Sequence, residues 1–288
     1  DITDQLAKSK TQKIRVRVWD PSDSGPQPRG KQVKEPKGIW YTPVTGIWQT
    51  VWLETVPESY VSSLYSNTDW ENGVQAFYPE ISGAKDGLEV EVTVKDGGTI
   101  AGTFKGKANA PLPVKINSPK AWSPDSPVLY EVSAKLFEGK KLIEEVKSYA
   151  AYRDIRMAKT PDGHQRMFLN GKPLFQYGPL DQGWWPDGLY TAPSDEAMLF
   201  DIEKTKEMGF NMIRKHVKVE PARWYYHTDR LGLLVWQDMP NGDHGNHWES
   251  RPGVIGQGTE KKRTPESEEI FKTEWKAIMD AFRHFPSI

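Results

Sequence analysis

Cysteine is absent from this chain of 288 residues, so disulfide bonds, thiol catalysis and thiolate metal sites are excluded. Long apolar runs are also missing: no stretch approaches the roughly 20 residues that a membrane-spanning helix needs. Neither sign of charge is in excess, because 38 basic and 39 acidic residues give a formal net charge of −1. This balance predicts neither a nucleic-acid partner nor attraction to an anionic membrane.

Aromatic residues and proline are abundant, with 12 Trp, 11 Tyr and 22 Pro. Aromatic rings fill large cores, but they also stack on sugar rings, and composition does not separate these two uses. The length is enough for about two or three domains.

The first 56 residues predict β structure. Apolar and polar side chains alternate in KIRVRVWD (residues 13–20) and in GIWQTVWLETV (residues 46–56). Pro and Gly gather between these two runs, as a loop requires. We expect part of a β-sandwich here. Trp40, Trp48 and Trp52 are expected at an interface with a neighbouring domain.

Residues 57–158 also predict β structure, with the spacing of hairpins. LEVEVTV (residues 88–94) alternates strictly, and Asp96-Gly97 predicts the turn into a returning strand. About seven short strands in this length favour an immunoglobulin-like sandwich.

From residue 159 onward the expected order is strand, helix, strand, helix, strand, helix. The strands are predicted at residues 173–179, 210–213 and 233–238, with helices after Ser194, near Pro221 and from Glu266. This alternation predicts parallel βαβ units, which bind ligands beyond the carboxyl ends of their strands. Three such units cannot close an eight-stranded barrel, so either the sheet is open or the barrel is cut short.

Several stretches, in order along the chain, resemble glycoside hydrolase family 2, and most of all its β-galactosidase-type members. The similar stretches are GIWYTPVTGIWQTVWLE, AWSPDSPVLYEVSAKL, SYAAYRDIRM, FLNGKPLFQYGP and DIEKTKEMGFNMIRKHVKVEPARWYYHTDRLGLLVWQDMP. The family order is jelly roll, immunoglobulin-like sandwich and (β/α)8 TIM barrel. The resemblance therefore implies the end of a sugar-binding jelly roll at 1–56, the immunoglobulin-like sandwich at 57–158 and the first three βα units of the barrel at 159–288.

The resemblance also implies a retaining β-glycosidase that acts on terminal β-galactoside-type linkages. Such enzymes use two carboxyl groups about 5 Å apart, one as acid/base and one as nucleophile. In the family both are glutamates, after strands 4 and 7, so we expect neither within these 288 residues. The chain is then an internal fragment that is inactive alone. The alternative is a non-catalytic carbohydrate-binding or structural fragment.

Three places depart from the family pattern. Many members have Arg-x-Ser-His after strand 2, where this chain has Arg214-Lys215-His216-Val217. A shift of one residue could turn His216 away from the sugar. The usual Phe-Gly-x-Arg at the domain junction is Ala150-Ala151-Tyr152-Arg153, and the usual Asp-Glu after strand 3 is Gln237-Asp238.

Five candidate substrate-binding residues follow the first two strands. Asp181 could accept hydrogen bonds from sugar hydroxyls or simply form a turn in its loop. Trp184 and Trp185 could stack on a pyranose or pack against the sandwich. Lys215 or His216 could reach the sugar, or the two could form a solvated pair in a loop.

Two further candidates form a possible ion pair. Arg214 is expected in a buried pair that orients the site, with Asp238 as its partner. Asp238, at the end of a strand, could bind substrate or a metal, support the acid/base or cap the strand. His244 and His247 could hold a cation, but no ligand set is complete, so we predict a polar loop and no metal site.

The expected partner is a carbohydrate, with a homo-oligomer also possible. No cofactor is expected for this chain, although Mg²⁺ or Na⁺ could serve the intact enzyme. The first residues lack a signal-peptide pattern, so we expect a leader to be absent or already removed. A polysaccharide substrate would suit the periplasm or exterior, and a cytoplasmic location stays open.

Overall fold

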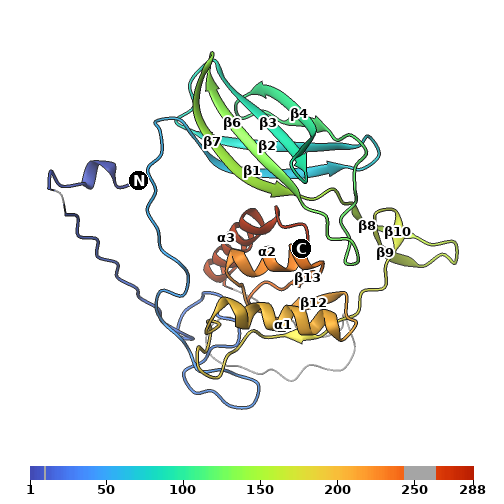
Figure 1. Cartoon of the computed structure of the whole chain (residues 1–288). Coiled ribbons are helices and arrows are strands. Elements are labelled where there is room, and N and C mark those ends of the chain that lie inside the picture. The colour runs from blue at the N-terminus through green and yellow to red at the C-terminus, as the bar shows by residue number, and fades with distance from the viewer. Residues whose placement is uncertain (10, 243–263) are drawn as a thin grey trace.

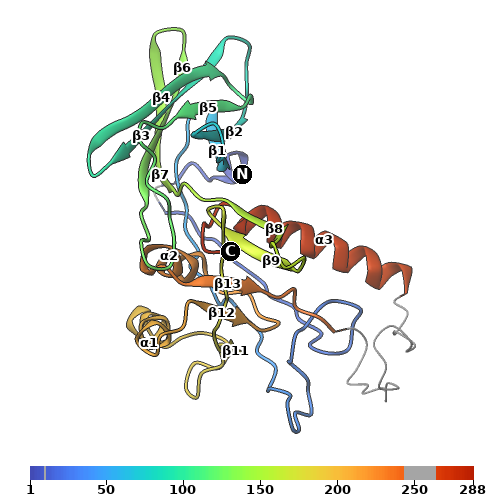
Figure 2. The same ribbon diagram turned by 90° about the vertical axis from the view of Figure 1, so that its right-hand side faces the viewer.

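The computed structural model describes residues 1–9, 11–242 and 264–288. It has three parts: an extended N-terminal arm, a β-sandwich, and a layer of helices and parallel strands (Figure 1). The arm (residues 1–59) begins to one side of the sandwich, runs down to loop beneath the α/β layer, and then rises to enter the sandwich (Figure 1; Figure 2 shows the same path from the side).

Seven antiparallel strands form the sandwich, in sheets of order β1-β2-β5 and β4-β3-β6-β7. They are β1 (Tyr60–Asp69), β2 (Val74–Ser82), β3 (Leu88–Asp96), β4 (Thr99–Lys107), β5 (Leu112–Lys115), β6 (Tyr130–Glu138) and β7 (Lys141–Ala150). Every second residue of β3 from Leu88 to Val94 is buried, because alternate side chains point to opposite faces of a sheet. The prediction of a two-sheet sandwich is confirmed.

The arm contains a short 3₁₀ helix (Thr3–Gln5) and one β-bridge, between Gln32 and Tyr41, but no strand among its described residues. The strands predicted at residues 13–20 and 46–56 are therefore wrong. Their alternation is real, but their apolar faces are exposed, since no described strand pairs with them. An alternating strand is stabilised only when one face packs and its edges pair.

The three tryptophans of the arm differ in their surroundings. Trp48 packs edge-on against Tyr190 at 5.1 Å, and the guanidinium of Arg29 lies over the Trp40 ring. Trp52 is 69% exposed, so its predicted place at an interface is wrong. It lies on one of the unpaired extended runs.

The α/β layer is built on a parallel sheet of order β11-β12-β13. Its elements are β11 (Leu180–Asp181), α1 (Asp195–Glu207), β12 (Met212–Lys215), α2 (Ala222–Leu231), β13 (Leu234–Gln237) and α3 (Pro265–Phe282). The predicted order of strands and helices is confirmed. The first strand is misplaced, because residues 174–179 form no strand and the strand that pairs with β12 begins only after Pro179. Proline has no N–H to give to a ladder.

Local capping explains where the helices begin. The Ser194 hydroxyl accepts a hydrogen bond from the backbone N–H of Ala197 at 3.2 Å, which fixes the start of α1. Thr264 caps α3 in the same way through the N–H of Ser267 at 3.1 Å. Between the sandwich and the sheet, β8 (Ile155–Lys159), β9 (Gln165–Leu169) and β10 (Lys172–Pro173) form a small antiparallel sheet.

A buried carboxylate joins the sandwich to the α/β layer. Asp229 of α2 is fully buried, and Tyr149 of β7 donates a hydrogen bond to it at 2.7 Å. The Ser287 N–H donates to the second carboxylate oxygen at 2.8 Å. The indole N–H of Trp122 donates to the Asp229 carbonyl at 2.7 Å. Burial raises the pKa of Asp229 to about 6.

Candidate functional site

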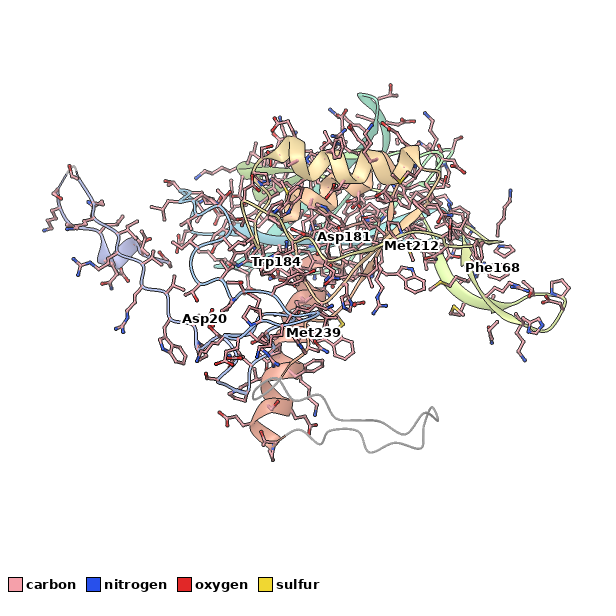
Figure 3. All side chains as sticks on the ribbon, turned by 90° about the horizontal axis from the view of Figure 1, so that it is seen from below. Asp20, Phe168, Asp181, Trp184, Met212 and Met239 are labelled. Atoms are coloured by element: carbon pink, nitrogen blue, oxygen red, sulfur yellow. The ribbon has the colours of Figure 1, made fainter. Side chains whose placement is uncertain are left out.

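The carboxyl ends of the three parallel strands meet at one edge of the sheet. Beyond β11 and β12, the His216 N–H donates to the Asp181 carbonyl at 2.8 Å. Beyond β12 and β13, the Asp238 N–H donates to the Lys215 carbonyl at 3.1 Å. The strand-end residues predicted from the sequence are therefore brought together, as the geometry of parallel sheets requires. Figure 3 places Asp181 and Trp184 centrally, between the arm that carries Asp20 and the hairpin that carries Phe168.

A buried ionic cluster lies directly beneath this edge. The Lys215 side chain is 1% exposed, and its ammonium contacts the carboxylates of Asp181 and Glu220, the latter at 2.9 Å. Lys218, 3% exposed, contacts the same Glu220 oxygen at 2.9 Å. We call Asp181, Lys215, Lys218 and Glu220 the lysine cluster. A solvated position for Lys215, one of the alternatives above, is wrong.

Strand alternation explains why Lys215 is buried. Lys215 shares a face of β12 with Ile213, and both pack toward Trp224 of α2, whose ring lies 4.3 Å from the ammonium. Burial alone would lower the pKa of Lys215, but the charges of Glu220 and Asp181 raise it above its ordinary value. Both lysines of the cluster are thus held by carboxylates.

A second polar group lies on the other face of β12. The guanidinium of Arg214 donates two hydrogen bonds to Asp238, at 3.0 and 2.9 Å. Nδ1 of His216 lies 3.0 Å from the same carboxylate. The desolvated Asp238 would have a raised pKa, but hydrogen bonds with Arg214 and His216 hold that pKa below its usual value.

The predicted pairing of Arg214 with Asp238 is confirmed, but its predicted burial is wrong. The Arg214 side chain is 44% exposed, because it lies on the open face of the sheet. The Asp238 carboxylate also contacts Nδ1 of His216. This contact orients the imidazole ring and leaves Nε2 for another partner.

A pocket of about 200 Å³ opens above the lysine cluster. One side comes from the strand ends and their loops, including Gln182, Trp184, Tyr190, His216 and Lys218. The other side includes arm residues and two residues of α3, Glu274 and Ile278. This volume corresponds to roughly seven water molecules, the scale of a single sugar ring.

Trp184 is held in a small aromatic stack. Its ring lies parallel to Tyr41 of the arm, with centroids 4.5 Å apart, and edge-on to Tyr190 at 5.9 Å. The Tyr41 hydroxyl also donates to Gln182 at 2.9 Å. One face of Trp184 is therefore already covered by Tyr41. Burial, aided by the Glu220 charge, raises the pKa of Tyr190 to about 12.

The predicted site residues thus differ in their access to the pocket. Trp184 and His216 line it, whereas Lys215 lies below and Trp185 does not line it. Asp181 and Asp238 contact groups beside it. Their roles toward a substrate stay predictions. Four residues at or below the pocket were not predicted from the sequence: Glu220, Lys218, Gln182 and Tyr41.

The sequence did carry a signal for part of what was missed. In HVKVEP (residues 216–221) the charged residues alternate with valines immediately after a strand end. No local pattern could have signalled Tyr41, which meets Trp184 across more than a hundred residues of chain.

Neither a metal cluster nor a membrane span is found in the described ranges. Across residues 1–9, 11–242 and 264–288, no three His, Asp or Glu side chains are grouped so as to hold a metal ion. The possible cation loop with His244 and His247 lies outside the described residues. No helix in the part of the chain that the structure describes combines the length and apolar character needed to cross a membrane.

Comparison with known proteins matches residues 70–153, which form most of the sandwich, to "Glycosyl hydrolases family 2". A putative β-glucuronidase of Formosa agariphila is 30% identical over 221 residues, which cover 73% of this chain and 21% of that protein. A β-galactosidase of Halalkalibacterium halodurans is 26% identical over 212 residues, covering 70% of this chain and 20% of that protein. The chain belongs to glycosyl hydrolase family 2.

The fold agrees with this membership. A β-glycosidase from Bacteroides vulgatus superimposes with a TM-score of 0.68 at 22% identity, covering 87% of this chain and 31% of the other. This family 2 chain spans about a fifth to a quarter of the length of the curated relatives it matches.

Proposed function

We propose that this chain is the sugar-binding front part of a retaining β-glycosidase. One observation carries the proposal: a sugar-sized pocket lined by aromatic and polar side chains lies at the carboxyl edge of a parallel α/β sheet in a family 2 chain. That edge is where sheets of this kind bind their ligands. The relatives named above are β-glucuronidases and β-galactosidases, and the intact protein would hydrolyse terminal β-linkages of this kind.

Within the pocket, each candidate residue receives a proposed role. His216 offers Nε2 to a sugar hydroxyl, and Trp184 supplies its uncovered face to the ring. Asp181 and Asp238 accept hydrogen bonds from hydroxyls or position their neighbours, and Trp185 contributes a contact in the same loop. Lys215 acts through Asp181, and Arg214 acts through Asp238.

Asp181 and Glu220 do not provide the catalytic pair. Asp181 and Glu220 both contact Lys215, so the two lie close together. The Glu220 side chain is only 4% exposed, and two lysines neutralise it. It can neither protonate a leaving oxygen nor attack a sugar. We therefore keep the proposal that the acid/base and the nucleophile are glutamates after strands 4 and 7, and that these 288 residues alone are inactive.

The domain assignment is also a proposal. Residues 57–158 form a seven-stranded sandwich, which supports the immunoglobulin-like domain. Residues 159–288 contain three parallel strands with alternating helices, which supports the start of a TIM barrel. The unpaired alternating runs of residues 1–56 support a jelly-roll end that lacks its neighbours. A periplasmic or secreted location suits a polysaccharide substrate.

Sugar binding by the 288-residue chain tests the proposal directly. Tryptophan fluorescence would be followed during titration with methyl β-galactoside and methyl β-glucuronide. We expect a saturable change that His216→Ala weakens at least several-fold and that His164→Ala leaves intact, since His164 is exposed on the β8–β9 hairpin. A structural fragment would give no saturable change with either sugar.

Hydrolysis is tested on the longer protein encoded by the source gene. Aryl β-galactosides and aryl β-glucuronides are the assay substrates, and the 288-residue chain is the negative control. Cleavage by the longer protein with retained anomeric configuration is expected. Binding without cleavage would instead support a carbohydrate-binding protein.

A further inference from the structure

The N-terminal arm forms one wall of the pocket rather than a loose extension. The backbone N–H groups of Arg29 and Gly30 both donate to the Asn241 carbonyl, at 2.9 and 2.7 Å. Tyr41 holds the same part of the arm through its stack on Trp184 and its bond to Gln182. Two separate attachments therefore fix residues 29–41 over the strand ends.

Gly30 shows how closely the arm approaches the sheet edge. It is buried, and its φ of +62° lies in the left-handed region. A β-carbon there would lie 2.6 Å from the carbonyl oxygen of Val217, a backbone atom that cannot swing aside. The arm can sit against the pocket only with glycine at this position.

The arm brings positive charge to the pocket. Lys31 lines it, is half-buried, and makes no ion pair or side-chain hydrogen bond within residues 1–9, 11–242 and 264–288. The other basic side chains that line the pocket are already engaged. Lys218 contacts Glu220, His216 contacts Asp238, and the guanidinium of Arg29 lies over the Trp40 ring. Lys31 is thus the ammonium that a ligand in this pocket could use.

The described lining of the pocket contributes little negative charge. Glu274 of α3 is the carboxylate among the described lining residues, and it forms no ion pair with Lys31. Desolvation raises the pKa of Glu274. A half-buried ammonium without a partner favours an anionic ligand, because a charge-assisted contact offsets its lost hydration.

We propose that the arm makes this pocket selective for glycosides that carry a negative charge, with Lys31 contacting the anionic group. The group is a carboxylate, as in a uronic acid, or a sulfate ester on the sugar. This inference rests on the proposed function, because it assumes that the pocket binds a sugar.

Calorimetric titration of the 288-residue chain with three matched probes tests it. The probes are methyl β-D-glucuronide, methyl β-D-glucoside 6-sulfate and neutral methyl β-D-glucoside. We expect at least one anionic probe to bind about tenfold or more tightly than the neutral probe, as a charge-assisted hydrogen bond would give. The tighter of the two anionic probes identifies carboxylate or sulfate as the recognised group.

Variants test whether Lys31 is the residue that gives the preference for anionic probes. Lys31→Gln should remove most of the tenfold preference and leave neutral-sugar binding unchanged. The control Lys37→Gln changes the net charge equally, but Lys37 is exposed and does not line the pocket. Glu274→Gln should strengthen binding of the anion a few-fold by removing an opposing charge. Gly30→Ala should displace the arm and abolish the preference as Lys31→Gln does.

The outcomes separate this inference from the proposed function. Equal affinity for all three probes, or equal losses in Lys31→Gln and Lys37→Gln, would overturn the inference and leave sugar binding standing. Absence of binding by all three probes, and by the methyl β-galactoside used to test the proposed function, would overturn the proposed function as well.

Discussion

Replacing Glu220 with glutamine should be the most damaging single charge change in the described part of the chain. The substitution keeps the shape of the side chain and removes one negative charge beside two buried lysines. Lys215 would keep Asp181, whereas Lys218 would lose its carboxylate partner and keep the Gly183 carbonyl. Breaking a buried ion pair by removing one partner costs about 3–5 kcal/mol. We expect a loss of this size in the free energy of unfolding at pH 7.

The loss in unfolding free energy should also depend on pH, because it depends on the protonation of the buried lysines. In the native protein Glu220 and Asp181 raise the pKa of Lys215, so its stabilising contribution is full below the unfolded pKa of about 10.4. That contribution is lost as the pH rises through the folded value. Burial already lowers the pKa of Lys218 in the native protein, with the Glu220 charge opposing it, so Glu220→Gln should lower that pKa further. The folded variant then binds fewer protons than the unfolded one, and its stability rises with pH. The difference between the two proteins should therefore shrink between pH 7 and pH 10.

Urea unfolding followed by circular dichroism at several pH values measures this difference. Glu207→Gln is the matched control, since its pair with Lys204 is 61% exposed on the glutamate side and should cost under about 0.5 kcal/mol. The double variant Glu220→Gln/Lys218→Met should recover much of the loss, because it removes the stranded charge. A loss below about 1 kcal/mol at pH 7, or one that stays constant up to pH 10, would refute the reasoning.

The remaining predictions concern the domain joint and the exposed ion pair. The raised pKa of Asp229, about 6 against about 4 unfolded, makes its contribution to stability fall as the pH rises from 4 to 6. The stability of the native protein minus that of Asp229→Asn should fall by roughly 3 kcal/mol across this window, and a flat difference would contradict the burial. Arg214→Gln should cost at most about 1 kcal/mol near neutral pH, because the pair with Asp238 is half exposed. Since Asp238 has a lowered pKa, that cost should begin to diminish as the pH falls below about 4 and should disappear only once the pH has fallen through the lowered pKa of Asp238. Gly232→Ala should cost more than about 1 kcal/mol, because φ is +73° and a β-carbon would lie 2.5 Å from the Pro124 carbonyl oxygen; faster cleavage between sandwich and sheet in limited proteolysis would show the loosened joint.

The elements predicted well are those whose rules are local. Ser194 caps α1 because a side-chain oxygen reaches an N–H within the same turn, whatever lies elsewhere in the chain. The strict alternation of LEVEVTV gives β3 its two faces for the same reason. The runs at residues 13–20 and 46–56 obey the same local rule, yet they form no strand, since a strand also needs a partner.

For the candidate site, too, the sequence predicted some features and not others. The order of strands and helices placed Asp181, Lys215, His216 and Asp238 at one edge, because parallel strands all end on the same side of a sheet. The pattern did not say which face each residue takes. Ile213 packs toward α2, and this decides that Lys215 is buried and Arg214 exposed.

By itself, the sequence determined the family, the two-sheet sandwich, the alternation of strands and helices, and the strand ends that carry the ionisable residues. These follow from periodicity, capping and local motifs, which act over a few residues. Only the tertiary structure decided that Glu220 holds both lysines and that the arm closes the pocket with Tyr41 and Lys31. These contacts join parts of the chain that no local pattern relates, and burial then decides which charges are neutralised by a neighbouring side chain.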